Sequence, residues 1–251
     1  MSVAGDRYGA DRGGFGETVK IIALALMLAL VVRTFFFQPF NIPSGSMKDT
    51  LLIGDYIFVS KYSYGYSRYS FPFAPDMFRG RIFSAKPERG DIAVFKLPRD
   101  PSVDYVKRVI GLPGDKIQMI DGVLNINGIA VPKVRLEDEI ATDEFGQTTR
   151  VARYRETLPN GVSYTVLDLD PHGFFDNTQV FDVPPDHYFM MGDNRDNSTD
   201  SRVLGAVGYV PLENFVGRAA MVFFSVKEGN HAWQFWLWPW TVRFDRIFKM
   251  L

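Results

Sequence analysis

The sequence predicts a mainly β protein: a membrane-anchored antiparallel β domain with a β-rich insertion and one N-terminal transmembrane helix. Two observations support this fold class. One long apolar run lies near the N-terminus, and after Pro39 short stretches of β-forming residues alternate with Gly and Pro turns. The sequence shows no Gly-rich phosphate loop, no strand–helix alternation and no repeat of fixed period. A length of 251 residues fits one elaborated domain.

The apolar run IIALALMLALVV occupies residues 21–32, between Lys20 and Arg33. Extended to residues 19–37, it would form about 28 Å of helix, which is enough to cross the hydrocarbon core of a bilayer. The two basic side chains would then lie near the helix ends, where they can reach the interface. The sequence therefore predicts a transmembrane helix at 19–37.

Two alternatives for this run stay open, a buried core helix and the apolar part of a cleaved signal peptide. Nothing in the run is amphipathic, and the following RTFFFQPF offers no small-x-small cleavage site. Positive charges are nearly balanced across the run, so its orientation rests on the short polar tail ahead of a large domain. We expect residues 1–18 to form a cytoplasmic tail and residues 38–251 an extracytoplasmic domain.

Six stretches after the run have the composition of β strands, with turn signals such as Gly54-Asp55 and Gly90-Asp91 between them. Residues 133–183 are more polar and irregular, and we expect them to form the insertion. The six predicted strand segments are LLIGDYIFVS, RGDIAVFKLP, DYVKRVIGLPGD, GVLNINGIAV, HYFMMGDN and FVGRAAMVFFSV.

The composition excludes several classes of function. The chain has no cysteine, which removes thiol catalysis, disulfides and Cys-type zinc sites. Its 28 Lys and Arg are matched by 29 Asp and Glu, so we expect no nucleic-acid partner. Three histidines leave little material for a metal centre, and we expect neither a metal nor a cofactor. The oligomeric state is left open.

The 37 aromatic residues are unevenly placed, with 14 in residues 35–83 and 7 in residues 231–251. From Thr241 onward, helical spacing places four apolar side chains on one face and three basic ones opposite, typical of an interfacial anchor. The alternative is that residues 231–251 pack on the protein's own core. The apolar set is Phe244, Ile247, Phe248 and Leu251, and the basic set is Arg243, Arg246 and Lys249.

Candidate chemistry begins with a serine and a lysine. A histidine-based triad is not expected, because no G-x-S-x-G elbow accompanies the histidines. Pro43-Ser44-Gly45-Ser46-Met47 holds two hydroxyls in a tight bend just after the apolar run. Strand alternation places Lys107 between Tyr105 and Val109 on one face, where lost hydration would lower its pKa toward that of a general base. Alternatively, Ser46 begins a helix capping box and Lys107 is a soluble edge residue.

A third segment, GDNRDNSTDSR, covers residues 192–202 after a predicted strand. Asp193 and Asn197 fit positions 1 and 5 of a calcium loop. However, Arg195, Ser198 and Leu204 stand where such a loop needs an oxygen ligand, glycine and glutamate, so the calcium interpretation fails.

Taken together, these segments resemble the sequence boxes of type I signal peptidases, membrane-bound Ser–Lys endopeptidases that cut signal peptides from exported preproteins. IPSGSM, YVKRVIGLPGD and GDNRDNSTDSR match, as do GDYIFVSKYSYG and RGDIAVFK, in the family's order across residues 40–205. The resemblance implies a twisted antiparallel β domain with a second β-rich insertion. Asp49 stands where the family often has proline, and one apolar run is present where some members have two.

The resemblance implies residue roles. Ser46 would be the nucleophile, Lys107 the general base and Ser44 an oxyanion-hole donor together with the backbone N–H of Ser46. Ser198 would orient the lysine amine, and Asp200 and Arg202 would support the site, as Asp193 and Arg108 would.

The resemblance also implies the protein's surroundings. The partners would be signal-peptide-bearing preproteins and the lipid bilayer. The location would be the bacterial cytoplasmic (inner) membrane, with a single-pass anchor and the catalytic domain on the periplasmic side. Small residues, chiefly alanine, would be expected one and three positions before the cut. Two rival functions are a membrane-tethered binding module, in which Ser46 and Lys107 are structural, and a related peptidase dedicated to few substrates.

Overall fold

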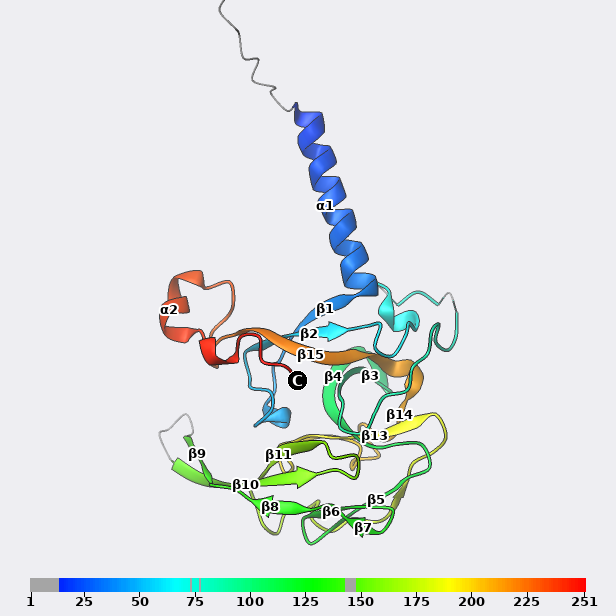
Figure 1. Ribbon diagram of the computed structural model, residues 1–251, viewed down its shortest axis with the longest axis vertical. Coiled ribbons are helices and arrows are strands. Elements are labelled where there is room, and N and C mark those ends of the chain that lie inside the picture. The colour runs from blue at the N-terminus through cyan, green and yellow to red at the C-terminus, as the bar shows by residue number, and fades with distance from the viewer. Residues whose placement is uncertain (1–13, 73, 77, 143–147) are drawn as a thin grey trace, which may run out of the picture.

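The computed structural model describes residues 14–72, 74–76, 78–142 and 148–251. Most of the expected cytoplasmic tail therefore lies outside the described residues. A single helix projects from a body built of three antiparallel β sheets (Figure 1). The predicted mainly β class is confirmed, and each of the six predicted strand segments contains at least one strand.

Helix α1, Phe15–Phe35, contains the apolar run but begins and ends earlier than the predicted 19–37. It is long and apolar enough to cross a membrane, and none of its most apolar window is buried inside the protein. This exposure excludes the alternative of a core helix. After Phe36 the chain enters β1, Phe37–Asn41, whose Pro39 lacks the N–H that a helix interior needs.

The sheet next to α1 has seven strands in the order β1-β2-β15-β3-β4-β13-β14, and every neighbouring pair is antiparallel. Alternation along its central strands buries both faces, since Val94 packs in one core cluster and Phe95 in another. The other strands of this sheet are β2 (Asp55–Ser60), β3 (Ile92–Leu97), β4 (Asp100–Gly111), β13 (His187–Met191), β14 (Val210–Pro211) and β15 (Phe215–Ser225).

The part of the body farthest from α1 contains two four-stranded sheets, which we call the distal lobe (Figure 1). Its strands run from Lys116 to Asp182, a longer stretch than the 133–183 for which the sequence predicts an insertion, because β12 pairs back onto β5 through Phe181 and Ile117. One core cluster, containing Leu124 and Val166, joins the two sheets. The strands are β5 (Lys116–Ile120), β6 (Val123–Ile126), β7 (Ile129–Ala130), β8 (Lys133–Arg135), β9 (Glu139–Thr142), β10 (Thr148–Thr157), β11 (Ser163–Asp168) and β12 (Phe181–Asp182).

The C-terminal segment corrects one prediction. The only α-helix in it is α2, Trp238–Thr241, so the amphipathic helix expected from Thr241 onward is wrong. The chain beyond α2 instead runs along β15 through the bridge between Met250 and Met221. Arg246, expected on the polar face, is buried and forms two hydrogen bonds of 2.9 and 2.6 Å with Asp55. Burial of Arg246 in this ion pair explains why the segment does not form the helix that its periodicity predicts.

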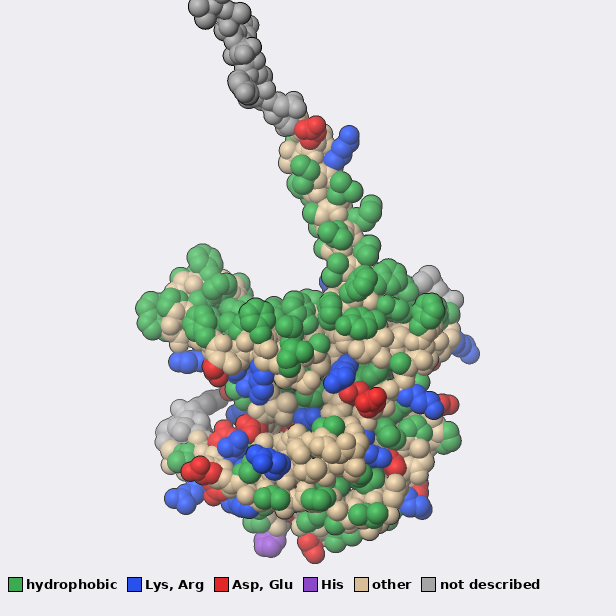
Figure 2. Space-filling view, viewed as in Figure 1, with side chains coloured by type: hydrophobic (Ala, Val, Ile, Leu, Met, Phe, Trp, Pro, Cys, Tyr) green, Lys and Arg blue, Asp and Glu red, His purple; other side chains and the backbone are tan. Residues whose placement is uncertain are grey.

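The same segment leaves large apolar side chains in solvent, Trp240 being 70% exposed. Figure 2 shows an apolar surface that extends from this segment to the foot of α1. We call this surface the apron. Its exposed members from the two ends of the chain are Phe35, Phe36, Tyr62, Trp233, Phe235, Trp236, Trp238 and Trp240. Other aromatics of the 35–83 cluster, such as Tyr64 and Tyr69, are buried, so the cluster serves the core as well.

Candidate active site

Ser46 and Lys107 lie in elements that are distant in sequence but adjacent in space. Ser46 lies on a short 3₁₀ turn, Gly45–Met47, directly after β1, and Lys107 lies on β4. The Nζ atom of Lys107 donates a hydrogen bond of 2.6 Å to Oγ of Ser46. Ser44, not Ser46, is the residue that precedes the turn, and it makes no capping bond. The interpretation of Ser46 as a helix cap is therefore wrong.

Lys107 is buried, with 3% of its surface exposed, so it is not a soluble edge residue. Its ammonium lies 5.3 Å from the ring centre of Tyr105, as strand alternation predicted. Burial lowers the pKa of Lys107 to about 8, against the opposing effect of Asp200 and Asp193. A neutral amine is therefore available near physiological pH, next to a hydroxyl.

Ser44 is the second hydroxyl of this group. Its Oγ lies 3.3 Å from Oγ of Ser46. Both side chains line a cleft of about 670 Å³ together with Lys107 and Ser198. A hydroxyl at this position can donate to an oxygen that becomes negative beside the nucleophile.

The segment after β13 forms the wall behind Lys107. The Oγ atom of Ser198 donates to Asp200 at 2.8 Å, and Arg202 binds the same carboxylate at 2.9 and 2.8 Å. Burial would raise the pKa of Asp200, but Arg202 and the other donors hold it below its usual range. Within the described residues, Lys107 bonds to Ser46 and not to Ser198. The structure thus brings Ser198 into the cleft beside Lys107 without the orienting bond that the resemblance implied.

Gly192, at the start of this segment, was not singled out by sequence reasoning. A Cβ atom at this position would lie 2.2 Å from Oγ of Ser198 and 2.6 Å from the backbone oxygen of Ser46. Only a glycine allows such close approach between the segment and the nucleophile turn.

Asn194 is a second residue that the sequence did not reveal. Its backbone N–H donates to the oxygen of Ser46 at 3.1 Å, and its side-chain amide donates to Gly45 at 3.0 Å. Both bonds depend on a contact across about 150 positions of chain, which no local pattern shows. Asn194 fixes the backbone of the turn that carries Ser46.

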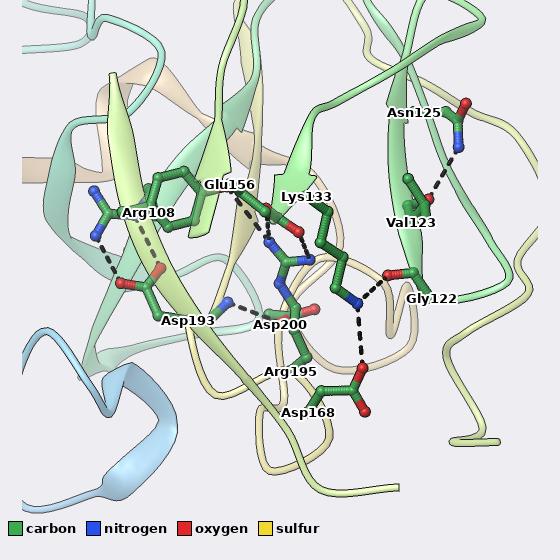
Figure 3. A network of polar contacts seen from close by, with 12 residues as sticks. Arg108, Gly122, Val123, Asn125, Lys133, Glu156, Asp168, Asp193, Arg195 and Asp200 are labelled. Carbon is green, nitrogen blue, oxygen red and sulfur yellow. Dashed lines mark hydrogen bonds and ion pairs between the residues drawn. The ribbon is translucent and has the colours of Figure 1, made fainter. Parts of the chain in front are cut away.

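Two buried ion pairs hold this wall to the rest of the body, and Figure 3 shows them close together. Arg108 donates to Asp193 at 2.9 and 2.6 Å. Arg195 donates to Glu156 of β10 at 2.8 and 2.5 Å, which ties the wall to the distal lobe. Because all four side chains are buried, removing one partner would leave an uncompensated charge.

The cleft runs between β1 and the first half of β4. β3 covers one edge of β4, while the described pairing of β13 with β4 involves Arg108 and the residues beyond it. A backbone edge at residues 103–107 therefore borders the cleft, and an extended peptide can add to such an edge as a strand.

No group of three or more His, Asp or Glu side chains that could hold a metal is found in the described parts of the chain. The polar groups lining the cleft are hydroxyls, amides, the amine of Lys107 and the carboxylates of Asp104 and Asp196. Such a set suits acyl transfer by a hydroxyl nucleophile with an amine base.

Comparison with known proteins adds independent information. The family model described as signal peptidase, peptidase S26, matches residues 15–224. The chain is similar to signal peptidase I of Rickettsia typhi (strain ATCC VR-144 / Wilmington), with 46% identity over 96% of this chain and 97% of the relative. It is also similar to signal peptidase I of Rickettsia prowazekii (strain Madrid E), with 44% identity over 96% of this chain and 97% of the relative.

Among solved structures, the chain is similar to a signal peptidase I from Enterococcus faecalis V583. The two chains share 28% identity over 53% of this chain and 97% of the other, with a TM-score of 0.31. A score of this size does not establish a shared fold.

Proposed function

This chain belongs to the signal peptidase family, peptidase S26, and on that premise we propose that Ser46 and Lys107 are the catalytic pair with which it removes signal peptides. It is a serine peptidase anchored in a membrane, and its substrates are preproteins that carry N-terminal signal peptides. The observation that carries the assignment of residues is the 2.6 Å hydrogen bond between two buried side chains, Lys107 Nζ and Ser46 Oγ.

The first half of the reaction forms an acyl-enzyme. Neutral Lys107 accepts the proton of Ser46 while Oγ attacks the scissile carbonyl carbon, and the carbonyl π electrons move onto its oxygen. The hydroxyl of Ser44 and the backbone N–H of Ser46 donate to that oxyanion. When the C–N bond breaks, the leaving amine takes the proton from Lys107.

The second half returns the enzyme to its starting state. Lys107, again neutral, accepts a proton from water, whose oxygen attacks the ester carbonyl. The intermediate collapses with loss of Ser46 Oγ, which recovers its proton from Lys107. Ser198, Asp200 and Arg202 act as positioning residues, because their hydrogen-bonded network forms the wall behind the amine.

The substrate binds as an extended strand in the cleft between β1 and β4. This is supported by the backbone edge of β4 at residues 103–107, which lines the cleft opposite the end of β1. Family resemblance adds that small residues, chiefly alanine, stand one and three positions before the cut. A panel of preproteins with alanine or phenylalanine at each position tests this, and efficient cleavage after phenylalanine would contradict it. Unrelated preproteins in the same panel separate general signal peptide removal from a dedicated peptidase.

The proposal also covers how the chain is arranged relative to the membrane. We propose a cytoplasmic tail, a single span formed by α1, and a catalytic domain that follows it on the periplasmic side of the bacterial cytoplasmic membrane. The apron supports this arrangement, since it lies at the foot of α1 (Figure 2) and would rest on the lipid surface. The cleft would then lie close to the depth at which cleavage sites emerge.

Contact between the apron and lipid can be measured without altering the chain. All four tryptophans lie in residues 231–251, so tryptophan fluorescence reports on this segment alone. In vesicles, brominated lipids should quench it strongly, whereas quenching no greater than that of free tryptophan would contradict lipid contact.

The test of function is cleavage of a preprotein by the full chain in detergent. Ser46→Ala and Lys107→Met should each remove the activity, because nucleophile and base act as one unit. Lys116→Met, which removes a lysine charge in the distal lobe, is the matched control and should cleave normally. Full activity of either site variant would exclude the mechanism. If the wild type did not cleave at all, the protein would be a tethered binding module.

A further inference from the structure

A second cavity, of about 360 Å³, lies at the foot of α1 and has no part in the proposed mechanism. Its walls come from the last turn of α1, from β1, from the segment around Tyr69, from the end of β3 and from the start of β4. It adjoins the catalytic cleft, since Phe40 and Asp104 line both.

Positive charge dominates this cavity. Its ionisable side chains are Arg33, Lys61, Lys96 and Asp104, three cations against one anion, which leaves a formal charge of +2. Asp104 is already engaged, because Lys96 binds it at 3.0 Å. Among the described residues that line the cavity, no second carboxylate faces Arg33 and Lys61.

Lys61 is the unusual member of this group, because only 3% of its surface is exposed. Its Nζ donates one hydrogen bond of 2.5 Å, to the backbone oxygen of Ser70. Burial and the nearby Arg33 lower the pKa of Lys61 to about 8. A carbonyl oxygen satisfies one donor but does not neutralise the charge, so a buried ammonium beside a guanidinium favours an added anion.

The level of the cavity relative to the bilayer indicates which anion it would bind. Arg33 lies in the last turn of α1, and Phe35 packs edge-on against Tyr66 and Phe71. Aromatic residues and the terminal cations of a span mark the level of lipid headgroups. At that level the abundant anion is the phosphodiester of a phospholipid.

We propose that this cavity binds the headgroup phosphate of an anionic phospholipid, held by Lys61 and Arg33. The lipid would occupy the junction between the span and the catalytic domain. This proposal rests on membrane anchoring but not on the catalytic roles of Ser46 and Lys107.

The experiment measures lipid binding and needs no cleavage. The full chain in an uncharged detergent is titrated with phosphatidylglycerol or phosphatidylcholine, and bound lipid is counted by native mass spectrometry. Wild type should bind phosphatidylglycerol at least about tenfold more tightly, and Lys61→Met and Arg33→Gln should each weaken that binding about fivefold. Arg33 is exposed, so its variant keeps the test valid if the buried lysine proves necessary for folding.

Lys116→Met removes the same charge far from the cavity and should bind phosphatidylglycerol as wild type does. Equal affinity of wild type for the two lipids, or equal losses in all three variants, would overturn the proposal. Excess inorganic phosphate should not displace the lipid. Displacement would assign the site to free phosphate and overturn the lipid assignment. Ser46→Ala should bind phosphatidylglycerol normally, which separates this result from any failure of the catalytic assignment.

Discussion

Lys107 in the cleft and Lys61 at the foot of α1 form a natural pair for comparison. Each is 3% exposed, and burial lowers the pKa of each to about 8. They differ in what the nitrogen contacts. Lys107 meets the hydroxyl of Ser46, whereas Lys61 meets the backbone oxygen of Ser70.

This difference shows that burial alone does not make a lysine catalytic. A hydroxyl can give up a proton to a neutral amine, but a carbonyl oxygen has none to give. The balance of surrounding charges differs too. Lys107 lies near two anions, Asp200 and Asp193, and one cation, Arg202, whereas Lys61 lies near two cations, Arg33 and Lys96, and one anion, Asp104. The same desolvation would therefore prepare the proposed base in one region and the proposed anion site in the other.

The largest expected effect comes from Lys107→Arg. Arginine keeps the charge and much of the length, but its guanidinium does not lose a proton near neutral pH. We expect preprotein cleavage to fall at least about 10⁴-fold, as far as in Lys107→Met. Single-turnover assays measure this. Substantial activity in Lys107→Arg would mean that Lys107 acts through its charge and not as a base.

Ser44→Ala should have the next largest effect. Loss of one oxyanion donor typically costs about 10²–10³ in kcat, while the nucleophile and base remain. The expected result is a lower kcat with little change in KM. An unchanged kcat would remove Ser44 from the oxyanion hole.

The pH dependence tests the lowered pKa of Lys107 directly. Below pH of about 8 the amine becomes protonated and cannot accept the Ser46 proton, so kcat/KM should fall about tenfold for each pH unit. The activity is thus gained as pH rises through about 8. A limb that titrated near the free lysine value of about 10.4 would show that Lys107 is not a desolvated base.

The smallest expected effect is that of Gly192→Ala, which removes no catalytic group. The added Cβ would press on Ser198 and the nucleophile turn, and overpacking of this kind costs about 1–3 kcal/mol. We expect a lower melting temperature and slower cleavage. Gly205→Ala, where a Cβ meets nothing within 4 Å, is the matched control. Equal behaviour of the two variants would contradict the close approach at Gly192.

Local patterns predicted the parts of the molecule that depend on neighbouring residues. Strand alternation was enough to place Tyr105 beside Lys107, and turn residues marked the bend that carries Ser46. The family resemblance named Ser44, Ser198, Asp200 and Arg202, and the structure brings all four near Ser46 and Lys107.

Long-range pairing explains what the sequence could not reveal. The distal lobe begins at β5 because Phe181 pairs with Ile117. No sequence pattern near residue 116 indicates that its pairing partner lies more than sixty residues later in the chain. Asn194 and Gly192 matter only through the turn at Ser46. In the C-terminal segment, apolar residues recur at helical spacing in the sequence. The chain nevertheless forms no helix there, because Arg246 is buried in an ion pair with Asp55.

The junction between α1 and β1 has a consequence for substrate choice. Phe36 alone separates the two elements, and its backbone oxygen accepts a hydrogen bond of 2.9 Å from the backbone N–H of Lys61. The nucleophile follows nine residues after Phe37, a stretch that spans at most about 30 Å. With Ser46 as the proposed nucleophile and α1 as the proposed span, the enzyme would cut at a fixed distance from the bilayer. We expect it to select preproteins by the length between their apolar segment and the scissile bond.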